Sequence, residues 1–265
     1  MSGTNDKRRL ALPEVTLVAA TSVNVSATIA AMEASMAEVA FGACLLLTDT
    51  RPDPLPQGID LVLIPPLISA DAYSDFILRN LGDYIATIHC LVIQWDGHVI
   101  DAGRWMPEFL DYDYVGASWP QFSDGHDVGN GGFSLRSRAL LEAIRNRGFK
   151  PSHPEDLAIG RHNRDWLEAQ GLRFAPRELA DTFAAERAGN PATSFGYHGV
   201  WQMPGILGRQ KFWQIYLSLD ERGSIRHDFY SLLRQVARGK GGAKRALHFI
   251  RNRIDDAKRE RSVVA

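Results

Sequence analysis

Apolar runs of strand length alternate with helical periodicity along the first part of the chain. The runs occupy residues 15–21, 43–48, 59–64 and 87–93. In residues 26–39 the apolar positions recur at spacings of three and four, which predicts a helix with Ser26 as its cap. A second helix is predicted over residues 70–81. Apolar strands that alternate with helices predict an α/β fold with a mostly parallel central sheet flanked by helices.

The pattern changes in the second part of the chain. Its predicted elements are a strand at 112–116, a glycine-rich segment at 129–132, a helix at 137–146 and a helical stretch that opens at 154. Beyond Pro204 the segments become amphipathic and basic, and Gly239–Gly242 interrupts them. We therefore predict one α/β domain over residues 10–205 and a helical C-terminal extension over residues 206–265.

Composition narrows the class of protein. Apolar residues make up 45% of the chain and charged residues 23%, which is typical of a soluble globular protein. The sequence has no apolar run of about 18 residues and no apolar core near its start, so neither a transmembrane span nor a secretory signal is expected. Cys44 and Cys90 lie far apart and form neither a disulfide framework nor a zinc motif. These features favour a cytoplasmic location.

Charge is distributed unevenly. The formal net charge is -1, yet eleven Lys/Arg stand against four Asp/Glu from Arg226 onward. This basic region is either the solvated face of ordinary helices or a surface for an anionic partner. A nucleic-acid partner is not expected, because the sequence contains no recognition module.

An apolar stripe follows the last predicted helix. It is formed by Ala243, Leu247, Ile250 and Ile254. The stripe fits packing against the main domain or against a second copy of the chain in a homo-oligomer. It also fits peripheral contact with the inner face of a membrane, where acidic lipids attract the surrounding Lys and Arg side chains.

Several catalytic classes lack their sequence motifs. No G-x-G-x-x-G follows the first strand, where Ala19-Ala-Thr21 stands, and no G-x-x-x-x-G-K-[ST] is present. The G-x-S-x-G turn of many hydrolases is absent as well. Dinucleotide oxidoreductases, P-loop NTPases and that class of hydrolase are therefore disfavoured.

The fourth apolar run ends in Gln94-Trp-Asp-Gly97. Ligands of open α/β sheets gather at the carboxyl ends of strands, so Asp96 is a candidate ligand for Mg²⁺ or Mn²⁺. The alternative is an Asp-Gly pair that only forms a turn. Thr21 and Asp49 follow the first two strands, and together with Gln94 they are candidate ligand-binding residues.

Two further segments could contribute to a ligand site. Gly129-Asn-Gly-Gly132 has little side-chain bulk, so a flat ligand such as a sugar ring could lie against its backbone, while Asn130 offers donors and acceptors. The alternative is a glycine-rich turn before a helix. Glu155 and Asp156 either complement a helix N-terminus or supply a carboxylate that accepts the proton of an attacking hydroxyl.

Taken in order, these segments resemble a known family. They are Gln94-Trp-Asp-Gly, Asp113-Tyr-Val-Gly-Ala-Ser-Trp-Pro, Gly129-Asn-Gly-Gly-Phe-Ser-Leu-Arg-Ser, Pro154-Glu-Asp and Phe195-Gly-Tyr-His-Gly. The ordered set resembles a bacterial family of uncharacterised glycosyltransferase-like domains with the GT-A fold. The resemblance covers about residues 13–205 and leaves the basic C-terminal region outside it.

The resemblance implies roles for individual residues. Asp96 matches the second acid of the Asp-x-Asp metal motif, Gln94 replaces the first, and His198 matches a late histidine ligand, which implies Mn²⁺ or Mg²⁺. Asp156 is the first choice for the catalytic base and Glu155 the second. The resemblance assigns donor or acceptor binding to Thr21, Asp49, Gln94, Trp119, Asn130, Gly131 and Gly132. Trp119 would stack on a sugar face, with a buried core tryptophan as the alternative.

The implied activity is a hexosyltransferase-like glycosyltransferase of polysaccharide biosynthesis. It would transfer a sugar from a nucleotide-sugar donor, expected to be UDP-linked, to a glycan or lipid-linked acceptor by inverting direct displacement. The alternative function is a nucleotide-sugar or glycan-binding protein without turnover, because Gln94 makes the metal motif degenerate.

Overall fold

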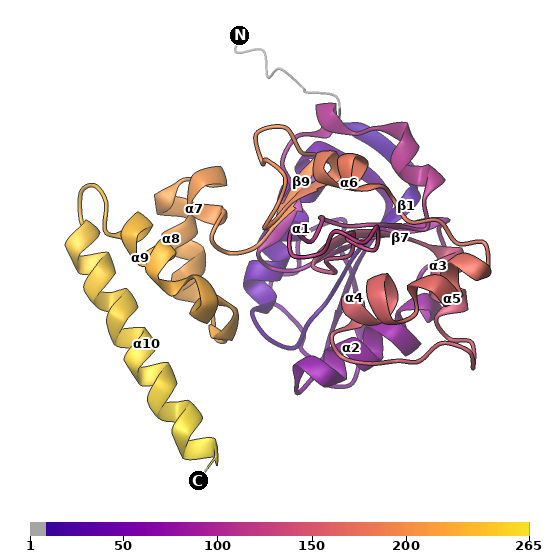
Figure 1. Ribbon diagram of the computed structural model, residues 1–265. Helices are drawn as coiled ribbons and strands as arrows, with labels where there is room; N and C mark the ends of the chain where they lie inside the picture. Colours follow the sequence, from indigo (N-terminus) through magenta and orange to yellow (C-terminus); the bar gives the residue numbers. More distant parts are fainter. Residues whose placement is uncertain (1–8, 265) are drawn as a thin grey trace. The chain divides into compact units, whose positions relative to one another are not determined.

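The computed structural model describes residues 9–264, and the side chains of residues 9–259. The chain divides into two compact units, Met1–His198 and Gly199–Ala265 (Figure 1). The division falls after His198, whereas the sequence pattern places it after residue 205. Residues 199–206 group with the C-terminal unit because the short helix α7 (Met203–Ile206) packs against the two helices that follow it.

A six-stranded sheet forms the centre of the first unit, in the order β3-β2-β1-β4-β7-β6. Its strands are β1 (Leu10–Ala20), β2 (Val39–Thr48), β3 (Asp60–Leu63), β4 (His89–Ile93), β6 (Tyr114–Val115) and β7 (Phe133–Ser137). The first four strands are parallel, and β7 runs antiparallel to β4 and β6. Ile93 pairs with Phe133, so the carboxyl end of β4 and the start of β7 meet at one edge of the sheet.

Helices and a small second sheet complete this unit (Figure 1). The helices are α1 (Val25–Glu38), α2 (Ala70–Arg79), α3 (Arg138–Ala143), α4 (Glu155–Leu157), α5 (Arg164–Ala169) and α6 (Arg177–Phe183), with a π-helical turn over Ala158–His162. The second sheet has the order β5-β9-β8. Its strands are β5 (Gly97–Val99), β8 (Ala184–Ala185) and β9 (Gly196–His198). The short β5 directly follows the carboxyl end of β4 and is held there by β9.

Both faces of the central sheet are buried. In β1, Leu17 belongs to one hydrophobic cluster, with Phe133 and Phe183, whereas the adjacent Val18 belongs to the other, with Phe76. Parallel strands covered on both faces are continuously apolar. This burial is the physical reason why the strands could be recognised as unbroken apolar runs. The predicted α/β fold class is confirmed.

Some predicted boundaries are wrong. The strands β1 and β2 begin earlier than their apolar runs, at Leu10 and Val39, and pair with each other from those residues onward. Ser26 lies inside α1 and does not cap it. The N-cap residue is Asn24, in a left-handed conformation with φ 53°, and its carbonyl accepts from the amide and hydroxyl of Thr28. The residue that caps α1 therefore lies two positions earlier than predicted.

The C-terminal unit is helical. Besides α7 it contains α8 (Arg209–Ser218), α9 (Phe229–Val236) and α10 (Gly242–Val264). Phe249 of α10 is 1% exposed and stacks on Phe229 at 5.0 Å between ring centroids. Arg222 donates to both carboxylate oxygens of Asp256 at 2.6 and 2.9 Å. Among residues 9–264 no helix combines the length and the apolar character needed to cross a bilayer.

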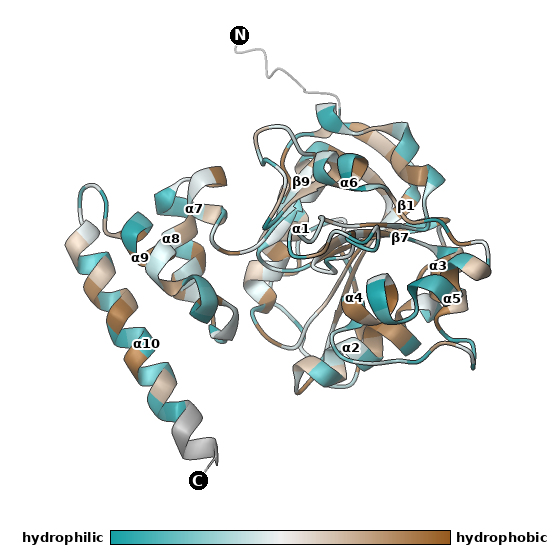
Figure 2. Ribbon diagram, viewed as in Figure 1, coloured by the Kyte–Doolittle hydropathy of each residue, from teal (hydrophilic) through white to brown (hydrophobic). Residues whose placement is uncertain are grey.

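The predicted apolar stripe lies on a different face of α10 from Phe249. Leu247, Ile250 and Ile254 are 71%, 38% and 51% exposed. Figure 2 shows apolar positions recurring along this helix among hydrophilic ones. Within its own unit, α10 therefore packs through Phe249 and leaves the stripe accessible.

Candidate functional site

Polar residues from separate segments meet where β4 ends. The N–H of Gln94 donates to the carbonyl of Gly132 at 3.0 Å, which extends the contact between β4 and β7 by one residue. Asp96 occupies the turn between β4 and β5 and is 5% exposed. His198 ends β9, where it pairs in register with Gly97 of β5. The small second sheet thus brings the late histidine beside the carboxyl end of the central strand.

His198 lies between two carboxylates. Its Nε2 is 3.2 Å from Oε1 of Gln94 and 3.4 Å from Oδ1 of Asp96, and its Nδ1 is 3.2 Å from Oε1 of Glu186. Burial alone would lower the pKa of His198, but the charges of Glu186 and Asp96 outweigh it and hold that pKa well above 6.5. Two carboxylates around one imidazole favour positive charge at this point, either a proton on the ring or a metal ion that replaces that proton at Nε2.

Gln94, Asp96 and His198 are residues that could hold a divalent metal. Ligand atoms at right angles about Mg²⁺ lie about 3 Å apart, given metal–oxygen distances of about 2.1 Å. The 3.2 and 3.4 Å separations of Nε2 from the oxygens of Gln94 and Asp96 are close to that spacing. A metal-bound histidine usually donates its other ring N–H to a carboxylate, and Glu186 is placed to accept it. Gln94, which replaces the first acid of the motif, therefore still offers an oxygen.

Two glycines connect this cluster to the acidic pair. A Cβ on Gly132 would lie 2.1 Å from Nε2 of His198, and a Cβ on Gly131 would lie 2.3 Å from Oε1 of Glu155. Both side chains therefore press directly against bare backbone. The preceding Asn130 has a positive φ of 37°. A side chain at position 131 would displace Glu155, and one at position 132 would displace His198.

Glu155 is fixed by an ion pair. It is 5% exposed, and its Oε1 lies 3.2 Å from Nη2 of Arg136, which is 0% exposed on β7. The hydroxyl of Ser74 donates to its Oε2 at 3.4 Å. A buried carboxylate held by a buried guanidinium is costly to move, because its displacement leaves a buried charge unpaired. Glu155 is therefore better suited to positioning than to proton transfer.

Asp156 accepts hydrogen bonds from backbone N–H groups, whereas Glu155 is ion-paired. Its Oδ1 accepts from the N–H of Leu157 at 2.7 Å, and its Oδ2 accepts from the N–H of Gly131 at 3.4 Å. Burial and the charge of Glu155 raise the pKa of Asp156 from 3.8 to about 6, against the lowering effect of these N–H groups and Arg136. A carboxyl group that titrates near neutral pH is suited to general base catalysis.

The site contains residues that sequence reasoning missed. They are Tyr73, Ser74, Arg136 and Glu186. The hydroxyl of Tyr73 accepts from Nε2 of Gln94 at 3.2 Å, and burial together with Glu155 raises its pKa. Arg136 lies on the buried strand β7, whose sequence Phe-Ser-Leu-Arg-Ser gives no signal that its guanidinium is buried. Glu186 follows the two-residue strand β8, too short to detect as a pattern.

Two other predicted site residues lie apart from this cluster. Thr21 follows β1, where its N–H donates to the carbonyl of Leu47 at 2.9 Å, and Asp49 is exposed beyond the end of β2. Both are at the carboxyl edge of the parallel strands, and among the described residues neither bonds to Gln94, Asp96 or His198. Their ligand-binding roles stay predictions.

Trp119 is buried, which agrees with the alternative of a core tryptophan. It is 7% accessible, and its ring packs against Gly129 and Gly160 and edge-on to Phe122 at 5.7 Å. A Cβ on Gly129 would lie 1.8 Å from the indole ring. Because two glycines leave room for the ring, the tryptophan is buried in the fold and its faces are not free for a sugar.

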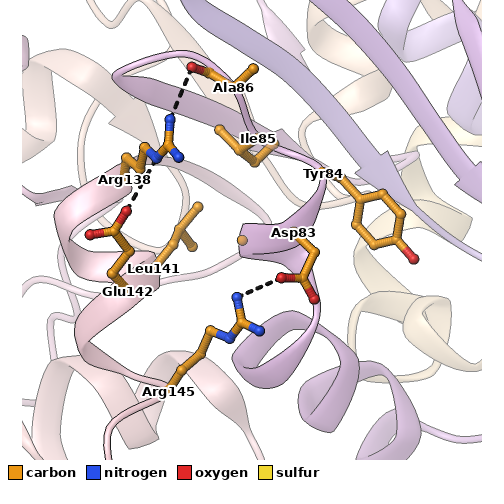
Figure 3. Close-up of a pocket in the computed structure, with 9 residues that line it drawn as sticks. Asp83, Tyr84, Ile85, Ala86, Arg138, Leu141, Glu142 and Arg145 are labelled. Atoms are coloured by element: carbon orange, nitrogen blue, oxygen red, sulfur yellow. Dashed lines mark hydrogen bonds and ion pairs between the residues drawn. The ribbon is translucent and has the colours of Figure 1, made fainter.

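A hollow of about 400 Å³ lies at the opposite edge of the central sheet (Figure 3). It adjoins Arg138, which follows the carboxyl end of β7, and Ser137 there pairs with the first residue of β4. Arg138 lies 3.2 Å from Glu142, and Arg145 lies 2.6 Å from Asp83. Since both guanidinium groups are paired with acids, this hollow shows no arrangement suited to chemistry.

A second acidic cluster lies on the surface. Among residues 9–259, ligand atoms of three His, Cys, Asp or Glu residues come within 4.8 Å of one another at His126, Asp165 and Glu168. The side chain of Asp165 is 92% exposed and that of Glu168 41%. Such exposed groups are common without a metal, and we assign this cluster no role.

Solved structures with similar folds include glycosyltransferases. The galactosyltransferase LgtC, in complex with donor and acceptor sugar analogues, is 15% identical, with a TM-score of 0.43 over 80% of this chain and 99% of its own. The mannosyltransferase PcManGT from Pyrobaculum calidifontis, in complex with GDP-Man and Mn²⁺, is 10% identical, with a TM-score of 0.43 over 93% and 76%. GlyE from Streptococcus pneumoniae TIGR4 is 13% identical, with a TM-score of 0.38 over 60% and 44%. With TM-scores below 0.5 and identities of 10–15%, these likenesses carry no assignment for this chain.

Comparison of sequences gives the family. No curated protein matches the chain. A family model described as "Protein of unknown function (DUF5672)" matches residues 66–198. That range contains Gln94, Asp96, Asp156 and His198, and it leaves out Thr21 and Asp49. Because the model matches half of the chain, this protein belongs to the DUF5672 family.

Proposed function

We propose that the protein is a metal-dependent glycosyltransferase that uses a nucleotide-sugar donor. One observation carries this proposal. A set of metal-ligand atoms and a carboxylate with a raised pKa meet at the carboxyl edge of the central sheet, on either side of the Gly131-Gly132 backbone. Ligands of open α/β sheets bind at this edge.

Gln94, Asp96 and His198 would hold the metal, with Glu186 orienting the imidazole. A divalent ion bound there neutralises the charge that develops on the leaving diphosphate. Tyr73 supports the arrangement, because it accepts a hydrogen bond from the Gln94 amide and so turns the amide oxygen toward His198. The bare backbone of Gly131 and Gly132 leaves space beside these groups for the donor sugar.

Asp156 would act as the base. The oxygen of the acceptor hydroxyl forms a bond to the anomeric carbon of the donor, and the bond from that carbon to the diphosphate oxygen breaks. The electron pair leaves with the nucleoside diphosphate, and the hydroxyl proton passes to the Asp156 carboxylate. A single displacement of this kind inverts the anomeric configuration. With a pKa of about 6, Asp156 is ionised at neutral pH and ready to accept the proton.

The identity of the substrates rests on the sequence resemblance. A UDP-linked hexose and a glycan or lipid-linked acceptor, as in bacterial polysaccharide biosynthesis, stay predictions. If the acceptor is lipid-linked, we expect a cytoplasmic protein that binds the inner face of a membrane through α10. The exposed Leu247, Ile250 and Ile254 support peripheral attachment, since basic side chains flank this stripe. The same stripe could instead join two copies of the chain.

Donor binding and turnover with and without Mn²⁺ test the proposal. A thermal-shift screen of nucleoside diphosphates and their sugars identifies the donor, because a ligand that binds only the folded state raises its melting temperature. Asp96→Asn is expected to abolish most of the Mn²⁺-dependent binding, since the amide removes a charged ligand. His198→Ala is expected to weaken binding less, because water can refill one coordination position.

Two outcomes separate the alternatives. If Asp96→Asn and His198→Ala bind nucleotide and Mn²⁺ as the parent does, the metal site is wrongly assigned. If the parent binds a nucleotide sugar but neither hydrolyses nor transfers it, the protein is a binding protein. Gln94 gives this second function some support, because it leaves the metal site with one carboxylate fewer than the Asp-x-Asp motif.

A further inference from the structure

The C-terminal unit contains an open hollow of about 870 Å³ that the proposed function does not use. It lies between the first turns of α8, the loop that joins α9 to α10, and the start of α10. Five of its lining residues are basic: Arg209, Lys211, Arg238, Lys240 and Arg245. Among the described residues that line it, none is acidic. The hollow therefore gathers positive charge without an internal counterion.

Four of these cations have no ion-pair partner among the side chains that the structure describes. Arg209, Lys211, Arg238 and Lys240 form no ion pair with any described acid, and all four are exposed. Elsewhere in the same unit, Arg222 pairs with Asp256, and Arg251 and Lys258 pair with Asp255. Like charges that face one hollow repel one another and focus a positive potential there. An anionic ligand would relieve that repulsion.

The fifth cation organises the wall of the hollow. Arg245 donates to three backbone carbonyls, those of Val236, Arg238 and Lys240, at 2.9, 2.7 and 3.0 Å. Gly239 and Gly241 take positive φ values of 73° and 76°, which allow the loop to curl around the guanidinium. The loop that carries Arg238 and Lys240 is thus fixed before any ligand arrives, which reduces the entropy lost on binding.

We propose that this hollow binds an anion that carries at least two phosphate groups. A guanidinium group can donate two parallel hydrogen bonds to two oxygens of one phosphate, and a lysine adds a compact positive charge. Five cations exceed what a single phosphate would neutralise, and the volume admits a larger anion. Two sources share this chemistry: a free diphosphate, and the phosphate headgroups of anionic lipids. The inference stands apart from the transferase proposal, because the hollow lies outside residues 66–198.

Calorimetric titration of the full-length chain with inorganic pyrophosphate tests the site. EDTA is present throughout, so that metal-dependent binding at the first unit does not contribute. Arg209→Gln/Lys240→Gln removes two charges from the hollow and spares Arg245. Arg251→Gln/Lys258→Gln is the matched control, since it removes two charges from the same unit outside the hollow. Thermal unfolding verifies that both variants fold.

The hollow variant is expected to bind pyrophosphate at least about tenfold more weakly than the parent, and the control to bind as the parent does. No binding by the parent, or equal losses in both variants, would overturn the proposal. Sedimentation with phosphatidylglycerol vesicles, compared with neutral phosphatidylcholine vesicles, identifies the source. If only the hollow variant loses binding to phosphatidylglycerol vesicles, the ligand is a lipid headgroup. If that variant binds the vesicles as the parent does, the ligand is a free diphosphate.

Discussion

The substitution Asp156→Asn is expected to make the protein more stable than the parent above neutral pH. Burial and the charge of Glu155 raise the pKa of Asp156 from 3.8 to about 6. A carboxyl group with a raised pKa opposes folding once it ionises, so this cost is absent below about pH 4 and complete above about pH 6. The rise in pKa corresponds to at most about 3 kcal/mol. Asp156→Asn removes the cost because the amide keeps the shape and does not ionise.

Urea unfolding of parent and variant at several values between about pH 4 and pH 8 measures this effect. The two free energies of unfolding are expected to agree near pH 4 and to diverge in favour of the variant as the pH rises. Asp111→Asn is the control, because Asp111 is an exposed carboxylate, and it should show no pH-dependent gain. A difference between Asp156→Asn and the parent that stays constant across this range would refute the reasoning.

The substitution Asp156→Asn is also expected to abolish most of the sugar transfer. Removing a general base usually costs about 10²–10⁴ in rate. Donor affinity should be kept, because the base acts on the acceptor hydroxyl and not on the diphosphate. A variant that is more stable, binds donor and no longer transfers sugar would show that the protein retains an unfavourable charge for function. Near-normal turnover would remove Asp156 from the mechanism.

Two further substitutions test the parts around Asp156. Gly132→Ala places a Cβ 2.1 Å from Nε2 of His198, so it should weaken Mn²⁺ binding measured by calorimetry, whereas Gly205→Ala, which meets nothing within 4 Å, should leave it unchanged. Equal Mn²⁺ affinity in both variants would contradict the close approach. Arg136→Gln leaves Glu155 buried without its ion-pair partner and should cost about 3–5 kcal/mol in urea unfolding, and a loss under 1 kcal/mol would mean that the pair matters little.

The central sheet could be predicted because its strands are buried on both faces. Leu17 and Val18 face opposite hydrophobic clusters, so their strand reads as an unbroken apolar run. The short strands could not be predicted in the same way. β8 has two residues and β9 three; β9 pairs with β8 and, across a long separation in sequence, with β5. A pattern of two or three residues carries no periodicity.

The candidate site was predictable only in part for the same reason. Asp96 follows a strong strand signal, and its place at the strand end is a rule of α/β folds. Glu186 reaches His198 because β8 and β9 pair in parallel, and no local feature of the sequence predicts this pairing. Between its two alternatives, the sequence could not decide for Trp119. Its burial depends on Gly129 and Gly160, ten and 41 residues further along the chain, which make room for its ring.

The order of roles within Glu155-Asp156 also depends on a distant residue. Two adjacent acids are chemically alike in a sequence, and nothing in Pro154-Glu-Asp distinguishes them. Arg136 does so in the fold, because its guanidinium forms a buried ion pair with Glu155 and none with Asp156. Burial and the charge of Glu155 raise the pKa of Asp156, while the N–H of Gly131 donates to its carboxylate beside the glycine backbone that touches His198. In the proposed mechanism, this difference makes Glu155 the positioning group and Asp156 the base.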